Sequence, residues 1–313
     1  MQHRPLGRSG LSIAPLVFGG NVFGWSADEG VSHRLLDAFI DGGFNAVDTA
    51  DVYSAWVPGH TGGESESVIG RWLKARGKRD DVVILTKVGM WPAQPGLSAA
   101  NIEAAVEGSL KRLQTDHIDL YQSHRDDADT PIDETLEAYD RLIKAGKVRA
   151  IGASNFTPAR LTDSLKVSAD KGLARYETIQ PKFNLFDRDE VEGELAALTG
   201  REGIGVIPFY GLAAGFLTGK YRTEADLEGR ARGATIKRDY LNPKGLKVLT
   251  ALDAAAKAVS ATPAQVALAW IMAHPAITAP LASATSVEQL TELMGAARLV
   301  LPAEVIAGLN TAG

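Results

Sequence analysis

The sequence predicts an α/β fold, a closed barrel of parallel strands in which a helix follows each strand. Short apolar runs alternate with helical patterns along the whole chain, and strands that alternate with helices form parallel sheets. In addition, several of the apolar runs end in a polar or aromatic residue, namely Asp48, Lys87, His124, Ser154, Gln180 and Phe209.

These strand-end residues follow one another 26 to 39 residues apart, which is the length of successive strand-plus-helix units. In a parallel barrel the carboxyl ends of the strands meet at one face, and that face carries the chemistry. We therefore expect residues that are distant in the sequence to converge on one pocket.

Composition narrows the class of protein. The chain has 313 residues, 45% of them hydrophobic, which suits one barrel domain over residues 1–313. The formal net charge of −5 argues against a nucleic-acid binder, and the lack of cysteine excludes disulfides and thiol catalysis. No apolar run approaches the ~18 residues of a membrane span, and no apolar leader is visible, so we expect a cytoplasmic protein without membrane contact. The oligomeric state is not predictable.

The elements follow in order from start and stop signals. Residues 2–15 have the turn chemistry of a hairpin, and the strand at 16–18 ends at Gly19 and Gly20, where the backbone must approach a neighbour closely. Thr157 followed by Pro158 is a typical helix start, and glycines such as Gly146 are typical helix stops. The sequence predicts helices over residues 32–40, 64–74, 98–110, 131–145, 158–171, 189–201, 243–260, 262–274, 286–297 and 302–309, and a last strand over 277–281.

One segment breaks the alternation. Residues 210–242 contain five glycines and scattered charge without a clear period. A compact domain rarely carries such a long loop unless the loop is functional. We therefore expect a functional loop, and we call residues 210–242 the long loop.

Four residues form a coherent proton-transfer set: Asp48, Tyr53, Lys87 and His124. An unperturbed tyrosine has a pKa of ~10, and a nearby Lys87 ammonium is expected to lower that pKa. Asp48 can hold Lys87 as an ion pair, and His124 can orient a carbonyl oxygen. Each residue alone is more typical of a structural role, but the combination predicts protonation of an oxygen while hydride reaches its carbon.

The chain lacks the sequence motifs of several other kinds of catalytic and cofactor-binding site. The chain contains no G-x-G-x-x-G after an early strand, no P-loop, no H-E-x-x-H and no G-x-S-x-G. We expect no bound metal, and a metal site built from His124 with Asp48 or Asp51 is the weaker alternative.

At this point the residues resemble the aldo-keto reductases over nearly the whole chain. The resemblance is carried by residues 44–53 (FNAVDTADVY), 85–87 (LTK), 116–121 (DHIDLY) with His124, 146–156 (GKVRAIGASNF), Gln180, 215–221 (GFLTGKY) and 286–290 (SVEQL). It implies a (β/α)8 TIM barrel with the N-terminal hairpin closing its bottom, and a nicotinamide cofactor bound across the barrel mouth.

The resemblance also assigns roles. Tyr53 resembles the general acid, with Asp48, Lys87 and His124 as its partners. Phe209 takes the place of the aromatic residue that stacks on the nicotinamide ring, and Ser154, Asn155 and Gln180 resemble the residues that bind its carboxamide. The remaining implied cofactor contacts are Gly20, Asn21, Asp48, Tyr210, Gly211, Leu212, Gly215, Leu217, Lys220, Ser283, Thr285 and Gln289.

The predicted function is therefore NAD(P)H-dependent, reversible reduction of a small aldehyde or ketone to an alcohol. NADP(H) is the expected cofactor and NAD(H) is possible, because residues 280–294 contain no basic residue to read the 2′-phosphate. Arg230 and Arg232 are candidates for that role. Aromatic residues on the loops, Phe23, Trp25, Trp56 and Trp91, predict an aromatic-walled substrate pocket. Two alternatives stay open, a cofactor-binding regulatory subunit and a metal-dependent barrel hydrolase.

Overall fold

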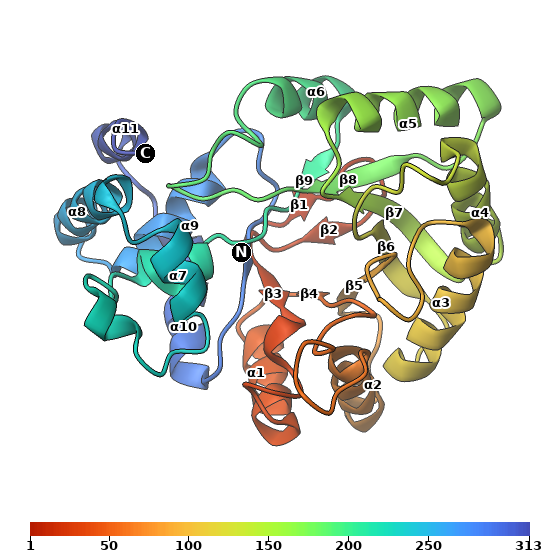
Figure 1. Cartoon of the computed structure of the whole chain (residues 1–313), viewed down its shortest axis with the longest axis horizontal. Coiled ribbons are helices and arrows are strands. Elements are labelled where there is room, and N and C mark those ends of the chain that lie inside the picture. Colours follow the sequence, from red (N-terminus) through yellow and green to blue (C-terminus); the bar gives the residue numbers. More distant parts are fainter.

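The computed structural model describes all residues from 1 to 313 and confirms the predicted α/β barrel. Eight parallel strands form one curled sheet in the order β10-β3-β4-β5-β6-β7-β8-β9 (Figure 1). The strands are β3 (Val17–Gly19), β4 (Ala46–Asp48), β5 (Val83–Val88), β6 (Ile118–Ser123), β7 (Val148–Ser154), β8 (Tyr176–Gln180), β9 (Gly205–Val206) and β10 (Leu281–Ala282).

Backbone hydrogen bonds join the two edges of this sheet. The N–H of Thr278 donates to the Val206 carbonyl at 2.8 Å, and the N–H of Leu281 donates to the Pro208 carbonyl at 2.8 Å. These bonds link the chain around β9 to the chain entering β10. The carboxyl ends of all eight strands therefore open onto one face.

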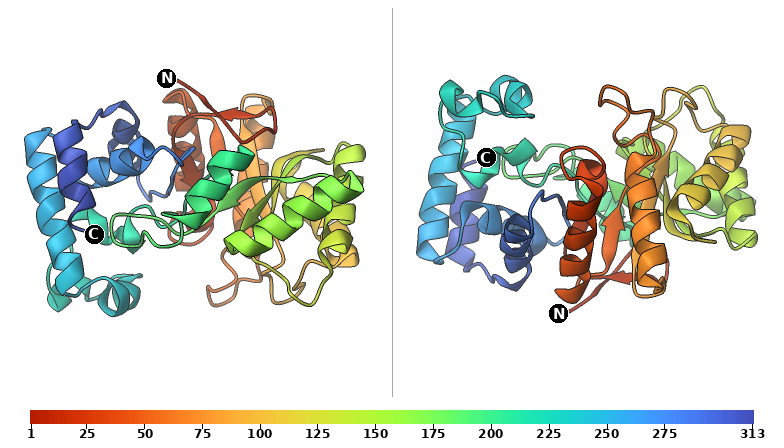
Figure 2. Two further views of the ribbon diagram at one scale, coloured as in Figure 1. Left: turned by 90° about the horizontal axis from the view of Figure 1, so that it is seen from above. Right: turned by 90° about the horizontal axis from the view of Figure 1, so that it is seen from below.

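The helices lie outside the sheet. Figure 1 shows α1 to α6 flanking the curled strands in chain order and α7 to α11 gathered together on the other side. In Figure 2, α8 and α11 lie side by side, in agreement with their mutual contacts. The helices are α1 (Glu29–Asp41), α2 (Glu64–Arg76), α3 (Ala99–Leu113), α4 (Ile132–Lys144), α5 (Pro158–Lys171), α6 (Glu194–Glu202), α7 (Gly233–Asp239), α8 (Pro243–Ala258), α9 (Pro263–Ala273), α10 (Val287–Gly295) and α11 (Ala303–Asn310).

The N-terminal hairpin closes the bottom of the barrel. Its antiparallel strands β1 (Arg4–Pro5) and β2 (Ser12–Ile13) carry Leu6, Leu11 and Ile13 into a buried apolar cluster with residues of the barrel strands. This cluster is separate from the larger core between sheet and helices. The hairpin thus seals one end of the barrel and leaves the carboxyl ends of the strands as the accessible face.

Three predicted elements differ from the structure. The last strand is Leu281–Ala282 rather than 277–281, because Thr278 and Ala279 both donate to Val206 in an irregular pairing. Helix α6 begins at Glu194, since Gly193 has a φ of 102° that no helix continues through. The long loop is partly helical.

Within the long loop the structure has three short helical segments. Two are 3-10 helices, Ala213–Thr218 and Glu224–Leu227, and the third is α7. Thr223 and Asp226 form a capping box that starts the second segment. Such local hydrogen bonds order a segment that has no apolar period. No helix in the whole chain is both long and apolar enough to span a bilayer.

Candidate active site

The centre of the site is a buried lysine at the accessible face of the barrel. Lys87, on β5, places its Nζ 2.6 Å from Asp48 Oδ2, 2.9 Å from the Tyr53 hydroxyl and 2.8 Å from the carbonyl of Thr49. Asp48 ends β4, and Tyr53 follows in the next turn. Because β4 and β5 are parallel neighbours, the strand ends bring the three side chains together.

Asp48 is held at both carboxylate oxygens. Oδ2 accepts from Lys87 and, at 3.4 Å, from the Tyr53 hydroxyl. Oδ1 accepts from Nε2 of Gln180 at 2.9 Å and from Nε2 of Gln122 at 3.4 Å. These four donors fix the orientation of the carboxylate toward Lys87. Gln122 did not emerge from the sequence, although a polar residue inside the apolar strand of β6 was the available signal.

The structure corrects the expected effect of Lys87 on Tyr53. Burial raises the pKa of the Tyr53 hydroxyl well above its usual value, and the Asp48 carboxylate raises it further. Burial also lowers the pKa of Lys87, against the opposing influence of Asp48. The reason is that desolvation disfavours the phenolate more than the shared ammonium favours it. Tyr53 therefore keeps its proton at neutral pH, which is the state that a proton donor requires.

His124 lies beside this set as a neutral imidazole. Burial lowers the pKa of His124 well below its usual value, and the positive charge of Lys87 lowers it further. Its ring centroid is 5.9 Å from that of Tyr53, and its Nδ1 is buried without a hydrogen-bond partner. Since His124 also lines the cavity, Nε2 is the nitrogen that can reach a bound molecule.

A cavity of about 650 Å³ opens above these residues. Its walls bring together strand ends, the long loop and the segment around β10, as the barrel topology requires. Of the predicted site residues it contains Asn21, Trp25, Asp48, Tyr53, Trp56, His124, Ser154, Asn155, Gln180, Phe209, Tyr210, Gly211, Leu212, Gly215, Lys220, Ser283, Thr285 and Gln289.

Three polar residues on one wall are already linked to each other. The Ser154 hydroxyl donates to the Gln180 carbonyl at 2.9 Å, and Asn155 Nδ2 donates to Ser154 Oγ at 3.1 Å. Asn155 Nδ2 also donates to the carbonyl of His124 at 2.9 Å. The amide nitrogen of Gln180 is committed to Asp48, whereas its Oε1 has no hydrogen-bond partner within the chain.

Two of the four predicted pocket aromatics lie elsewhere. Phe23 is fully buried and packs edge-to-face on Phe18 at 5.2 Å, so its ring belongs to the core. Trp91 donates from Nε1 to the Thr61 carbonyl at 2.8 Å, and the Arg112 guanidinium lies over its ring. Both residues fix loops against the barrel, and neither lines the cavity.

Three further predicted residues also lie outside the cavity lining. Lys87 is bonded to two residues that do line the cavity, Asp48 and Tyr53. Leu217 is fully buried in the core, and the Gly20 carbonyl accepts a hydrogen bond from Ser65. A Cβ at Gly20 would approach the Asp48 carbonyl within 2.9 Å, which is the close backbone contact that the sequence predicted at this point.

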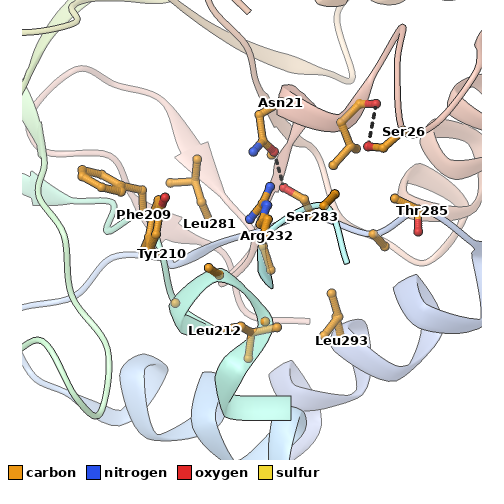
Figure 3. Close-up of a pocket in the computed structure, with 18 of the residues that line it drawn as sticks. Asn21, Ser26, Phe209, Tyr210, Leu212, Arg232, Leu281, Ser283, Thr285 and Leu293 are labelled. Atoms are coloured by element: carbon orange, nitrogen blue, oxygen red, sulfur yellow. Dashed lines mark hydrogen bonds between the residues drawn. The ribbon is translucent and has the colours of Figure 1, made fainter. Parts of the chain in front are cut away.

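Three cations line the cavity, Lys220, Arg230 and Arg232, and all come from the long loop. Figure 3 shows the Arg232 side chain beside Asn21 and Ser283, which are themselves in direct contact. With the Asn21 amide oxygen facing Arg232, that oxygen accepts from Nη2 at 2.9 Å while the amide nitrogen donates to Ser283 Oγ at 2.6 Å. The positive charge that residues 280–294 lack is therefore supplied by the long loop.

The sequence missed several other residues of the cavity. Met90, Ser26, Tyr221 and Glu292 line it. Met90 precedes Trp91 on a loop that the sequence marked as aromatic, so the loop was recognisable but the wrong side chain was chosen. No group of three histidine, aspartate or glutamate side chains in the structure is arranged to hold a metal ion.

Comparison with known proteins identifies the family of the chain. The model of the aldo/keto reductase family matches residues 15–312. The chain belongs to the aldo/keto reductase family. This membership makes it an oxidoreductase of a family that acts with nicotinamide cofactors on small molecules.

Its relatives match over nearly their full length. The chain is 37% identical to the uncharacterized oxidoreductase YrpG of Bacillus subtilis, with 99% of this chain and 95% of that protein covered. It is 33% identical to a probable voltage-gated potassium channel subunit beta of Oryza sativa, with 95% of this chain and 91% of that protein covered. It is 32% identical to the protein tas of Escherichia coli, with 99% of this chain and 97% of that protein covered.

Proposed function

We propose that the protein is an NAD(P)H-dependent carbonyl reductase that converts aldehydes or ketones to alcohols, reversibly, with Tyr53 as the proton donor. The observation that carries the proposal is the contact of one buried ammonium, Lys87 Nζ, with both Asp48 Oδ2 and the Tyr53 hydroxyl. A phenol that shares an ammonium with a fixed carboxylate can give up its proton and have the resulting negative charge stabilised at once.

The residues of the cavity fit a dinucleotide. Phe209 and Tyr210 lie at one end of the view in Figure 3, Thr285 and Leu293 lie at the other, and Arg232 lies between them. Aromatic rings suit a nicotinamide, and a guanidinium suits a diphosphate. When bound, the reduced nicotinamide supplies the hydride. NADP(H) is the cofactor we propose, with NAD(H) as the variant that comparison of the two will test.

The chain's own side chains supply the proton chemistry. His124, as a neutral imidazole, donates from Nε2 to the carbonyl oxygen of the substrate and orients it. Tyr53 gives its proton to that oxygen as negative charge develops there, and Lys87 then faces a phenolate. Asp48 keeps Lys87 in position throughout, because its other oxygen, Oδ1, is held by Gln180 and Gln122.

The substrate end of the cavity is apolar. Trp56 lies with its ring centroid 5.9 Å from those of both Tyr53 and Trp25, and Met90 lines the same cavity. The three cations of the cavity all belong to the long loop. We therefore propose a small, uncharged carbonyl compound or alcohol as the substrate, because a carboxylate or phosphate group would find no counter-ion beside Trp56.

The direct test is a cofactor-oxidation screen of the purified protein over uncharged and carboxylated aldehydes and ketones, with NADPH and NADH in parallel. Turnover of uncharged carbonyl compounds with either cofactor supports the proposal. Tryptophan fluorescence titration should also show saturable binding in the micromolar range or tighter, and absence of binding of both nucleotides would refute it.

A regulatory role is the second candidate. Likeness to a protein named as a probable voltage-gated potassium channel subunit beta favours a barrel that binds the cofactor and signals to a partner. This candidate predicts saturable cofactor binding with no turnover of any carbonyl compound, so the same pair of assays separates the two.

A further inference from the structure

Asp51 is a buried carboxyl that the proposed reaction does not use. Its side chain is 0% exposed, and neither carboxylate oxygen has a well-formed hydrogen bond to any group of the chain. The residue lies in the turn that leads from β4 to Tyr53, and its backbone N–H donates to the carbonyl of Lys87 at 3.3 Å. Asp51 is therefore packed against the strand that carries the central lysine.

A second buried acid, which interacts with Asp51 electrostatically, has partners that Asp51 lacks. Glu66, on α2, accepts from the Thr86 hydroxyl at 2.5 Å and from Nε of Arg112 at 2.7 Å. The charge of Arg112 is thereby paired with Glu66. Asp51 is thus left beside a neutralised pair without a counter-ion of its own, and its charge depends strongly on pH.

The titratable and charged groups that interact electrostatically with Asp51 are Glu66 of α2, Arg112 of α3, Lys87 of β5, Tyr121 of β6, Tyr139 of α4 and Tyr53 of its own turn. Burial and Glu66 raise the pKa of Asp51 to about 8, while Arg112, the Val52 amide and Lys87 lower it less. In the ionised state Asp51 raises the pKa of both Tyr53 and Lys87.

We propose that the charge of Asp51 controls how readily a proton is transferred between Tyr53 and the substrate. Asp51 does not touch the substrate and acts through Tyr53. The proposal rests on the carbonyl reduction proposed above. While Asp51 is neutral, Tyr53 faces one carboxylate, that of Asp48. Once Asp51 loses its proton to solvent, a second negative charge opposes formation of the Tyr53 phenolate. The ionisation of Tyr53 that limits both directions of the reaction is thereby moved to higher pH.

The test is the pH profile of kcat/KM, in reduction and in oxidation, for the wild type and Asp51→Asn. Removing the charge should move the ionisation of Tyr53 to lower pH by about 0.5–1 unit, the effect of one charge at several ångströms in an intermediate dielectric. The alkaline limb of reduction, which needs the phenol, and the acid limb of oxidation, which needs the phenolate, should both shift to lower pH by that amount. The KM for the cofactor at neutral pH should not change. Asp119→Asn is the matched control, since Asp119 is equally buried but is paired with Arg79 and Arg149 at the other end of β6; its alkaline limb should coincide with that of the wild type.

A second measurement does not depend on activity. The pKa of Asp51 is raised on folding, so the wild type should lose stability as pH rises from about 4, where the unfolded carboxyl ionises, to about 8. Asp51→Asn should therefore gain stability over the wild type at pH 8.5 relative to pH 5, measured by urea unfolding, and Asp51→Ala should show the same trend.

The outcomes separate the two proposals. Coincident alkaline limbs for the active wild type and for the two Asp51 variants would overturn the role of Asp51 and leave the carbonyl reductase intact. A stability difference that is the same at both pH values would also overturn it. A wild type that turns over no carbonyl compound would instead remove the proposed function, and this inference with it.

Discussion

Gln180 Nε2 donates a 2.9 Å hydrogen bond to Asp48 Oδ1, which joins two residues that are 132 positions apart in the sequence. The bond ties a residue that lines the cavity to the carboxylate that holds Lys87. A change at Gln180 is therefore expected to affect the position of Asp48, which also accepts a hydrogen bond from Tyr53. Gln122 donates to the same oxygen but does not line the cavity, so the two glutamines can be told apart.

Gln180→Leu should weaken both cofactor binding and turnover. Loss of one neutral hydrogen bond is worth about 1 kcal/mol, so the Kd for the nucleotide should rise about fivefold, with a fall in kcat from the loosened Asp48. Gln122→Leu is the control, and it should lower kcat while leaving the Kd unchanged. Fluorescence titration with steady-state kinetics measures both, and an equal rise of Kd in the two variants would refute the assignment.

Lys87→Met should abolish most activity and also destabilise the fold. Lys87 and Asp48 are almost completely buried, and removal of one partner leaves an uncompensated buried charge. We expect a stability loss of about 3 kcal/mol, at the low end for a broken buried pair because Gln180 and Gln122 still donate to Asp48. Urea unfolding at pH 7 measures this loss, and the control Lys166→Met, at an exposed position of α5, should be neutral. A fully stable Lys87→Met would contradict the ion-pair role.

The rate of carbonyl reduction should not fall at the pH where an ordinary histidine gains its proton. The pKa of His124 lies well below its usual value, so the imidazole is neutral above that value and gains its proton only at lower pH. Reduction at saturating substrate should therefore be nearly constant between about pH 6 and 7, where an unperturbed histidine titrates. A fall in kcat of about threefold from pH 7 to pH 6 would show that His124 titrates normally.

Arg232→Met should weaken the binding of NADPH and the binding of NADH to a similar extent. The guanidinium lies in the middle of the cavity, beside Asn21 and Ser283, where a diphosphate common to both cofactors is proposed to lie (Figure 3). A hydrogen bond to a charged group is worth about 1.5–3 kcal/mol, so each Kd should rise about 10- to 100-fold. Arg230→Met provides the comparison. If Arg232→Met affects NADPH alone, the residue reads the 2′-phosphate and not the diphosphate.

The sequence was sufficient for the features that depend on local pattern and on chain topology. Alternation of apolar runs and helices predicted the barrel, and strand-end positions alone brought Asp48, Lys87 and His124 to one face. Tyr53 could be assigned to the same set because it follows Asp48 closely in the sequence. These inferences succeed because parallel strands impose where their carboxyl ends lie.

The features that the sequence could not predict depend on side-chain direction and burial. Phe23 and Trp91 are on loops near the site, yet they face the core and Arg112, and loop position carries no signal for that choice. The opposed effects of desolvation and Lys87 on Tyr53 also required the burial of each group to be known. Arg232 was recognisable as a candidate, but its place beside Asn21 depends on how the long loop folds.

The proton donor is the central element of the proposed mechanism, and Tyr53→Phe tests it most directly. The substitution keeps the ring beside Trp56 and leaves Lys87 bonded to Asp48 and to the Thr49 carbonyl, so cofactor affinity and Tm should barely change. General acid catalysis is worth about 10²–10⁴-fold, so kcat for carbonyl reduction should fall by at least about 100-fold. A Tyr53→Phe enzyme that retains more than about a tenth of the wild-type kcat would contradict the assignment, because that loss is below the range for a general acid.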